Sequence, residues 1–304
     1  MSREDIKHRF GPDGISGFHA WGGFATGSFT DDTQMSLATA VGCIRAYHRF
    51  EDRGLCHPAT IVYHRYLEWY QLQKDPKQRR APGNTCMSAL GSRKMGTIEY
   101  PINDSKGCGG VMRTAPVGLA FPAGDAFQQG MECAAITHGH PSGYLSAGFL
   151  SELIARLLAG EAFEEAIEAS CAELRKYRGY EETLRAIQLA KEKVESHEEI
   201  EVAIPSIGQG WVGEEALGIS IYCSLKYSGD WEKGVLASVN HSGDSDSTGS
   251  ITGAILGTSL GIRSIPANLV NSVEDSGKIF KIANDMFKIF RAGEELSPVE
   301  YPPN

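Results

Sequence analysis

The sequence predicts an all-α protein that folds as one multi-helix domain. Apolar residues recur at alternating spacings of three and four positions, which is the period of a helix with one buried face. The clearest examples are residues 144–158, 162–175, 180–195, 214–228 and 275–291. Alternating apolar and polar runs joined by hairpin turns, which would indicate strands, are hard to find. No linker or domain-sized repeat is evident, so we expect a single domain over residues 1–304, with a proline-containing tail at 293–304.

The composition indicates a globular protein with an acidic surface. The 304 residues are 41% hydrophobic and 22% charged, and 38 acidic against 29 basic side chains give a net charge of −9. An acidic surface argues against non-specific binding to nucleic acid or to an anionic membrane. An anionic small molecule remains a candidate ligand, because a bound cation can reverse the local field.

The seven cysteines and the first residues indicate the compartment. The cysteines are odd in number, scattered and without a Cys-x-x-Cys pair, which disfavours a disulfide framework or a zinc cage and favours a reducing cytoplasm. The opening MSREDIKHRFGPDG lacks the apolar core of a secretory signal. No run of 18 apolar residues occurs, so we expect no membrane span.

Two short motifs, SFTDDTQM and NHSGDSDSTG, each place two carboxylates and a hydroxyl at the start of a helical pattern. They contribute Thr30, Asp31, Asp32, Asp244, Asp246 and Ser247. Either motif alone could simply cap a helix, because Asp and Thr are good N-caps and carboxylates gain from the helix dipole. Adjacent carboxylates repel, however, unless a proton or a cation stabilises them. Hard oxygen ligands suit Mg²⁺, Mn²⁺ or Ca²⁺ better than zinc, so the two motifs together predict a site for two cations.

The segment after the second motif has a glycine at every fourth position: Gly249, Gly253, Gly257 and Gly261. On a helix these glycines form a ridge without side chains, which predicts close approach of neighbouring helices. Ser and Thr throughout the segment argue against a membrane-spanning G-x-x-x-G helix. We therefore expect a tightly packed central helix with the cation site at its N-terminal end.

A glycine-rich loop in residues 103–118 is a candidate anion site. Gly107, Gly109 and Gly110 would permit positive φ angles and close approach of backbone N–H groups to a ligand, and Lys106 and Arg113 add positive charge. The alternative is a plain turn that leads into a buried segment. The loop lacks the spacing of a Walker A motif.

Two further features have both a structural and a functional interpretation. Residues 74–110 are polar, interrupted by Gly and Pro, and carry the basic residues Lys74, Lys77, Arg79, Arg80, Arg93 and Lys94. We favour a solvated loop here over a rim that contacts a protein substrate. His138, between two helical patterns, is either a structural hydrogen bonder or packs with Tyr144 against a sugar or base.

Together the motifs resemble the ADP-ribosylglycohydrolase family, which includes the dinitrogenase-reductase-activating glycohydrolase and the ADP-ribosylarginine and ADP-ribosylserine hydrolases. The matching stretches are SFTDDTQM, DSKGCGGVMRTAPVGL, ITHGHPSGY and GWVGEEALGISIYCSLK…NHSGDSDSTGSITGAILGT. Their order and spacing are similar to the family from about residue 10 to about residue 290.

The resemblance implies a Mg²⁺-dependent hydrolase, with Mn²⁺ as a substitute, that cleaves the glycosidic bond of ADP-ribosyl-arginine on protein or of another ADP-ribose-containing molecule. It implies two ions held by Thr30, Asp31, Asp32, Asp244, Asp246 and Ser247, where family members often have Thr in place of Ser247. It also implies a substrate site made of Ser105, Lys106, Gly107, Cys108, Gly109, Gly110 and His138, to which we add Tyr144. Asp31 and Asp32 are our candidates for orienting or deprotonating the water.

One departure from the family keeps a second function open. Family members begin with an apolar helix carrying a Gly-Asp-Ala-Leu-Gly-like motif, and this chain starts at the segment that follows it, Ser2 to Ile6. Loss of that helix would expose apolar surface, loosen the metal centre or abolish activity. The alternatives to a hydrolase are a catalytically weak or inactive ADP-ribose-binding protein, a toxin-neutralising immunity protein, or acids that hold a purely structural cation.

Overall fold

The computed structural model describes residues 1–303, which form 15 α-helices and no β-strand. The helices are α1 (Arg3–Phe10), α2 (Asp31–Arg53), α3 (Pro58–Leu72), α4 (Asn84–Gly91), α5 (Ala115–Ala120), α6 (Asp125–Ala135), α7 (Pro141–Leu158), α8 (Phe163–Leu174), α9 (Glu181–Glu195), α10 (Ile200–Ile207), α11 (Gly213–Lys226), α12 (Trp231–Val239), α13 (Ser245–Leu260), α14 (Ala267–Ser272) and α15 (Ser276–Phe287). Two 3₁₀ turns, Val111–Arg113 and Ile262–Ser264, and a π-helical turn, Lys288–Ala292, complete the described structure. The predicted all-α fold is confirmed.

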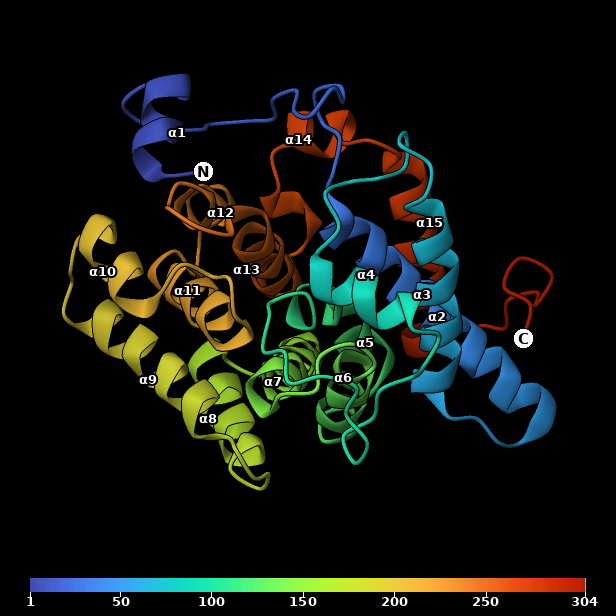
Figure 1. Cartoon of the computed structure of the whole chain (residues 1–304). Coiled ribbons are helices and arrows are strands. Elements are labelled where there is room, and N and C mark those ends of the chain that lie inside the picture. Colours follow the sequence, from blue (N-terminus) through green and yellow to red (C-terminus); the bar gives the residue numbers. More distant parts are fainter. Residues whose placement is uncertain (304) are drawn as a thin grey trace.

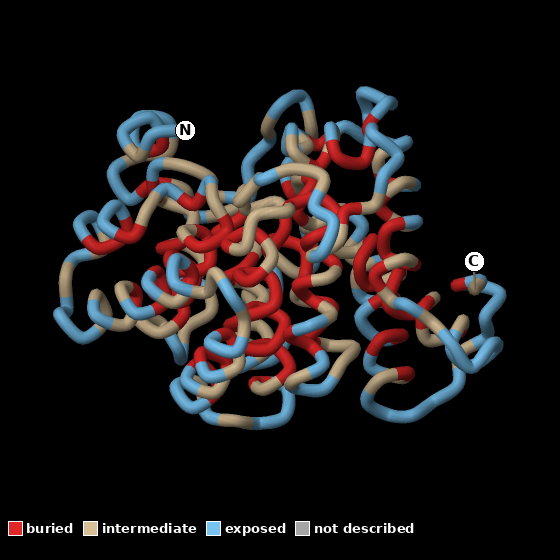
Figure 2. Tube along the Cα trace, turned by 60° about the horizontal axis from the view of Figure 1, so that its bottom comes forward, coloured by how far each residue is buried: buried red, intermediate tan, exposed pale blue. Residues whose placement is uncertain are grey.

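Helix α7 lies in the interior and contacts α6, α8, α11 and α13 (Figure 1). Its apolar residues occur all round the helix, so nearly every side chain from Ser142 to Leu157 is buried. A second apolar cluster surrounds α2, which packs against α3 and α15 on the other side of the molecule. Figure 2 shows the buried residues concentrated in the interior of the molecule and the exposed residues at its periphery.

All five helices predicted from periodicity form, with ends that shift by a few residues. Residues 275–291 form α15 and continue into the π-helical turn, which Gly293 ends in a left-handed conformation at φ 67°. The prediction of a wholly irregular segment at 74–110 is wrong, because α4 forms within it and buries Cys86, Ala89 and Leu90.

Helices α2 and α13 contact each other and the 3₁₀ turn Val111–Arg113, which brings the N-terminal ends of both helices to one place. The predicted close packing along the glycine ridge of α13 occurs only at Gly249, where an added Cβ would lie 2.6 Å from Val239 Cγ1. Beside Gly253 and Gly257 the nearest atoms belong to Trp231, at 3.6 and 3.8 Å, and Gly261 has open space. Trp231 and Val239 are the two ends of α12, so this one helix packs along the ridge, closely at Gly249 and through the indole of Trp231 farther on.

The two ends of the chain lie at the surface. Helix α1 sits beside α12 and buries Ile6 alone among its residues (Figure 1). Residues 294–303 form no helix, yet Tyr301 is buried and its hydroxyl donates to Asp285 Oδ2 of α15 at 2.7 Å. The division into one domain with a tail at 293–304 stays a prediction. In residues 1–303, no helix combines the length and the apolar character needed to cross a membrane.

Candidate functional site

The acidic residues of the two motifs meet at the N-terminal ends of α2 and α13. Asp31 and Asp32 occupy the first turn of α2, and Asp246 lies in the first turn of α13. One carboxylate oxygen from each of these three residues lies within 4.8 Å of the others. Asp244 immediately precedes α13. The fold therefore joins two motifs, from opposite ends of the chain, into one acidic cluster: Asp31, Asp32, Asp244 and Asp246.

Neither helix is capped by its motif. Thr30 and Asp244 occupy the N-cap positions of α2 and α13, but neither side chain accepts a capping hydrogen bond. Thr30 Oγ1 instead donates to Asp32 Oδ2 at 3.1 Å. Asp230 shows what a cap in this protein looks like, since its carboxylate accepts from the Lys233 N–H at 3.0 Å at the start of α12. The interpretation of the two motifs as capping devices is wrong.

The cluster has more negative charge than the protein compensates. In the described residues, no Lys or Arg forms a salt bridge with any of the four carboxylates, and the buried Asp32 Oδ1 has no hydrogen-bond partner. Burial, with repulsion from Asp246, raises the pKa of Asp31 to about 7, and the same two causes raise the pKa of Asp244 to about 6. Burial also raises the pKa of Asp32 well above its usual value. A divalent cation would satisfy the orphaned oxygen and relieve this repulsion, so the residues present fit such a group.

A cleft of about 350 Å³ opens over the acidic cluster. Asp31, Asp32, Asp244, Asp246 and Ser247 all line it, and the remaining wall comes from residues 81–86, residues 107–109, Met112, His138 and Trp211. The Gly83 N–H donates to Asp31 Oδ2 at 3.3 Å, which ties the segment before α4 to the acids. Thr30 does not line the cleft and reaches the cluster through its bond to Asp32.

The predicted substrate-binding residues divide into two groups. Gly107, Cys108, Gly109 and His138 line the cleft, whereas Ser105, Lys106, Gly110 and Tyr144 do not. The Lys106 ammonium donates to Glu214 at 2.5 Å and to Glu182 at 3.0 Å, so its charge is neutralised beside the cleft. Tyr144 packs against the apolar cluster around α7. The four residues outside the cleft wall are Ser105, Lys106, Gly110 and Tyr144, and their role in substrate binding stays a prediction.

The glycines of the 107–110 loop let neighbouring side chains approach the backbone closely, and they do not adopt unusual backbone angles. Its three glycines are absent from the positive-φ residues of the described chain. A Cβ on Gly109 would lie 3.1 Å from both His138 Cε1 and Cys86 Sγ. The N–H groups of Gly107 and Cys108 already donate to Ser105 Oγ at 3.3 Å and to the Trp211 carbonyl at 3.1 Å. The prediction of positive φ is wrong, and these two amides do not form the expected open nest.

Arg113 does not supply positive charge to the loop as the sequence suggested. Its side chain is fully buried, with the guanidinium 4.2 Å from the centre of the Tyr66 ring. It donates to Thr137 Oγ1 at 2.6 Å, and Thr137 Oγ1 lies 2.8 Å from His138 Nδ1. Burial, with the nearby Arg113 charge, lowers the pKa of His138 to about 3, so this imidazole is neutral.

Sequence reasoning missed two parts of the site. Trp211, which is 54% exposed, lines the cleft, although an isolated tryptophan in a loop carries no signal of its position. Arg80 is buried, stacks 3.9 Å from the Phe24 ring centre, pairs with Glu274 at 2.6 Å, and accepts the Asp31 N–H on its carbonyl at 2.9 Å. The preferred interpretation of a solvated basic loop is therefore wrong for Arg80, which supports the start of α2.

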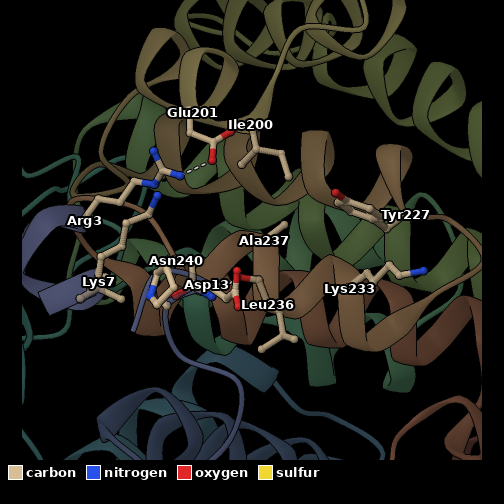
Figure 3. A pocket seen from close by; sticks show the side chains of 13 residues that line it. Arg3, Lys7, Asp13, Ile200, Glu201, Tyr227, Lys233, Leu236, Ala237 and Asn240 are labelled. Carbon is tan, nitrogen blue, oxygen red and sulfur yellow. Dashed lines mark hydrogen bonds and ion pairs between the residues drawn. The ribbon is translucent and has the colours of Figure 1, made fainter. Parts of the chain in front are cut away.

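A larger hollow of about 420 Å³ lies between α1, α10 and α12, away from the acidic cluster. Figure 3 shows that Arg3 points at Glu201 across it, and the two form an ion pair. Lys233, at its far end in the same view, pairs with Asp230 at 3.0 Å. Because its charges largely compensate one another, this hollow has nothing comparable to the uncompensated acids of the cleft.

This chain is similar to known proteins of one family. The sequence profile of the ADP-ribosylglycohydrolase family matches residues 1–295. The mouse ADP-ribosylhydrolase ARH3 is 24% identical over 302 residues, covering 86% of this chain and 78% of the mouse protein. The ADP-ribosyl-[dinitrogen reductase] glycohydrolase of Rhodospirillum rubrum is 24% identical over 282 residues, covering 90% and 83%. A solved ADP-ribosylglycohydrolase-related protein complex shares the fold, with a TM-score of 0.65 and 21% identity over 88% of this chain and 83% of that one. The chain therefore belongs to the ADP-ribosylglycohydrolase family.

Proposed function

We propose that this protein is a divalent-metal-dependent hydrolase that releases ADP-ribose from a modified substrate, with ADP-ribosyl-arginine on protein as the preferred linkage. Membership of the family and the activities named for its relatives support hydrolysis of ADP-ribosyl bonds. The observation that carries the metal dependence is the cluster of Asp31, Asp32 and Asp246 in the cleft wall, with the buried Asp32 Oδ1 left unpaired. We also propose a reducing cytoplasm as its compartment, because all seven cysteines are free.

The residues that would hold the cations come from both helix starts. They are Thr30, Asp31, Asp32, Asp244, Asp246 and Ser247. These side chains offer hard oxygen atoms, which suit two Mg²⁺ ions or Mn²⁺ in their place. Bound cations of this class supply Lewis acidity, neutralise the acids and lower the pKa of water towards neutrality.

The protein's own residues would perform the remaining tasks. Asp31 and Asp32 orient the attacking water and accept its proton, because both carboxylates lie in the wall of the cleft. The carboxylates also stabilise the positive charge that develops on the sugar in an oxocarbenium-like transition state. The neutral His138 donates a hydrogen bond to an oxygen of the bound sugar or phosphate.

The direct test is release of free ADP-ribose from ADP-ribosyl-arginine, measured first with Mg²⁺ and then with EDTA. We expect release with Mg²⁺ and none with EDTA. Release from ADP-ribosyl-serine or O-acetyl-ADP-ribose alone would keep the hydrolase and exclude the arginine preference. Tight ADP-ribose binding without turnover of any linkage at any metal concentration would exclude the hydrolase and favour a binding protein.

A further inference from the structure

A second hollow, of about 350 Å³, meets the cleft at Asp246. Among the described residues, Asp246 alone lines both the cleft and this hollow. The wall of the hollow comes from α1, from the segment that joins α1 to α2, and from the facing ends of α12 and α13 (Figure 1). The proposed hydrolysis assigns no role to it. Its wall includes four aromatic rings, and these belong to Phe10, Phe18, His19 and Trp21.

The indole of Trp21 is held in a fixed position in this wall. Its Nε1 donates to the Ser28 carbonyl at 3.0 Å, and its ring centre lies 5.0 Å from that of Phe24. Residues 18–20 are exposed, so the hollow opens to solvent on their side. A ligand that enters from there meets a preformed aromatic surface, and Asp246 lies where the hollow joins the cleft.

The protein's own Arg9 shows that a guanidinium can lie on this wall. Arg9 lines the hollow, and its guanidinium carbon lies 5.2 Å from the centre of the Phe10 ring. The His19 ring packs 4.5 Å from the same ring. Aromatic faces attract cations, and a planar guanidinium both stacks on rings and pairs with a carboxylate. Aromatic rings next to the Asp246 carboxylate therefore favour a guanidinium over a neutral or anionic group.

We propose that this hollow is the acceptor subsite of the hydrolase, and that it holds the arginine side chain to which ADP-ribose is attached. The inference rests on the proposed function. The bond to be cleaved joins a ribose carbon to a guanidinium nitrogen, so the two parts of the substrate must lie on adjacent sides of the acidic cluster, and the two hollows meet at Asp246. A carboxylate has two oxygen atoms, so Asp246 can bind a cation with one and the guanidinium with the other.

The reaction itself is the hydrolysis already proposed. The oxygen of water bonds to the ribose carbon, and the guanidine leaves with the electron pair of the broken bond and takes up a proton. The subsite adds discrimination between acceptors. A serine or acetyl acceptor has no cation to place on the aromatic wall, so binding in the hollow favours ADP-ribosyl-arginine.

The test compares Trp21→Leu with Trp21→Phe, because both lose the indole N–H but only phenylalanine keeps an aromatic face. We expect Trp21→Leu to raise KM for ADP-ribosyl-arginine by about 2- to 30-fold, the range for one cation–π contact. Trp21→Phe should retain most of the affinity. The inhibition constant of free ADP-ribose should stay unchanged in both variants, because that product occupies the cleft alone. Equal changes in KM and in this inhibition constant, or no change in either, would overturn the inference.

Arg9→Gln provides a test that a folding defect cannot imitate. It removes the cation that lies on the Phe10 ring, so we expect KM for ADP-ribosyl-arginine to fall. A raised KM would show that the hollow binds an anionic group and would overturn the inference.

Failure of the subsite and failure of the proposed function give different results. If the variants contradict the subsite while the wild type hydrolyses ADP-ribosyl-arginine, the proposed function stands. If no linkage is hydrolysed, the proposed function is rejected. Calorimetry with ADP-ribosyl-arginine and with ADP-ribose then decides the subsite, since Trp21→Leu should weaken binding of the first ligand only, and equal weakening of both would reject it.

Discussion

Thr137 Oγ1 lies 2.8 Å from His138 Nδ1 and so determines which nitrogen of this buried imidazole carries the proton. Arg113 donates to the same hydroxyl at 2.6 Å, and a guanidinium cannot accept a hydrogen bond. The positive charge of Arg113 favours a lone pair on the nearer ring nitrogen, so Thr137 donates to Nδ1 and the proton of His138 lies on Nε2. That nitrogen faces Gly107, where an added Cβ would lie 3.4 Å away. A hydrogen-bond donor is thereby directed towards the cleft.

Replacement of Thr137 by valine should remove the hydrogen bond that fixes the tautomer of His138. The buried Nδ1 of His138 and one N–H group of Arg113 lose their partner, so we expect a loss of about 1–3 kcal/mol in the free energy of unfolding. Thr137→Ser keeps the hydroxyl and should retain most of the stability. Denaturant unfolding measures the first effect, and nitrogen NMR of the histidine rings reports the tautomer. A wild-type His138 protonated on Nδ1 would refute the assignment.

Asp31→Asn should lower kcat/KM by more than about 100-fold, because it removes a carboxylate from the cation site and the proposed acceptor of the water proton. Asp230→Asn is the matched control. Asp230 also starts a helix, but its carboxylate caps α12 and lies outside the cleft, and asparagine caps a helix equally well. Steady-state hydrolysis of ADP-ribosyl-arginine compares the two. Equal activity in both variants would remove Asp31 from the mechanism.

The stability of the cation-free protein should fall as the pH rises from about 4 to about 7. Burial, with Asp246, raises the pKa of Asp31 from 3.8 to about 7 in the folded state, and burial, with Asp246, raises that of Asp244 to about 6. The folded protein therefore binds more protons than the unfolded chain in this window, and the slope of stability against pH is negative. Added Mg²⁺ should offset the loss at high pH.

Thermal melting in EDTA at pH 5 and pH 8 measures this effect, with Asp31→Asn as the reference that lacks one of the shifted carboxyls. We expect the wild type to lose more Tm than the variant between the two pH values. A wild type that gains Tm relative to Asp31→Asn on raising the pH would contradict the assigned direction.

Tyr301→Phe should loosen the last residues of the chain. The Tyr301 hydroxyl donates to Asp285 Oδ2 at 2.7 Å from a buried position. Loss of a hydrogen bond to a charged acceptor should cost about 1–3 kcal/mol in the free energy of unfolding. Tyr100→Phe is the control, because Tyr100 is 82% exposed and its ring should contribute little. We expect faster proteolysis of the C-terminal segment in Tyr301→Phe but not in Tyr100→Phe. Equal proteolysis of the two variants would show that the Tyr301–Asp285 hydrogen bond does not hold this segment in place.

Local sequence patterns predicted the helices well for a simple physical reason. A helix on the outside of the bundle buries one apolar face, and this requirement determines the spacing of its apolar residues, as in α8 and α9. Helix α4 was missed because it is only eight residues long and lies in a polar, glycine-punctuated segment. So short a helix depends on the packing of Cys86 and Leu90 rather than on its own propensity.

The acidic residues could also be found in the sequence, because adjacent carboxylates are unusual enough to require an explanation wherever they occur. The sequence could not decide, however, whether these acids cap a helix or bind a cation. An Asp at a helix start has the same local sequence in both cases, and only the tertiary structure shows Thr30 and Asp244 directed away from the first-turn amides. The same holds for Lys106 and Arg113, whose charges are taken up by Glu214 and by the Tyr66 ring.

The sequence by itself determined the helical class, the family resemblance and the two acidic motifs, because each depends on residues close together in the chain. Only the tertiary structure decided which predicted residues share the cleft. Cys108 Sγ meets Asp244 across 136 positions of sequence, and Trp211 joins the same wall. Contacts of this kind depend on how whole helices pack, and that packing is determined jointly by many side chains that are far apart in the sequence.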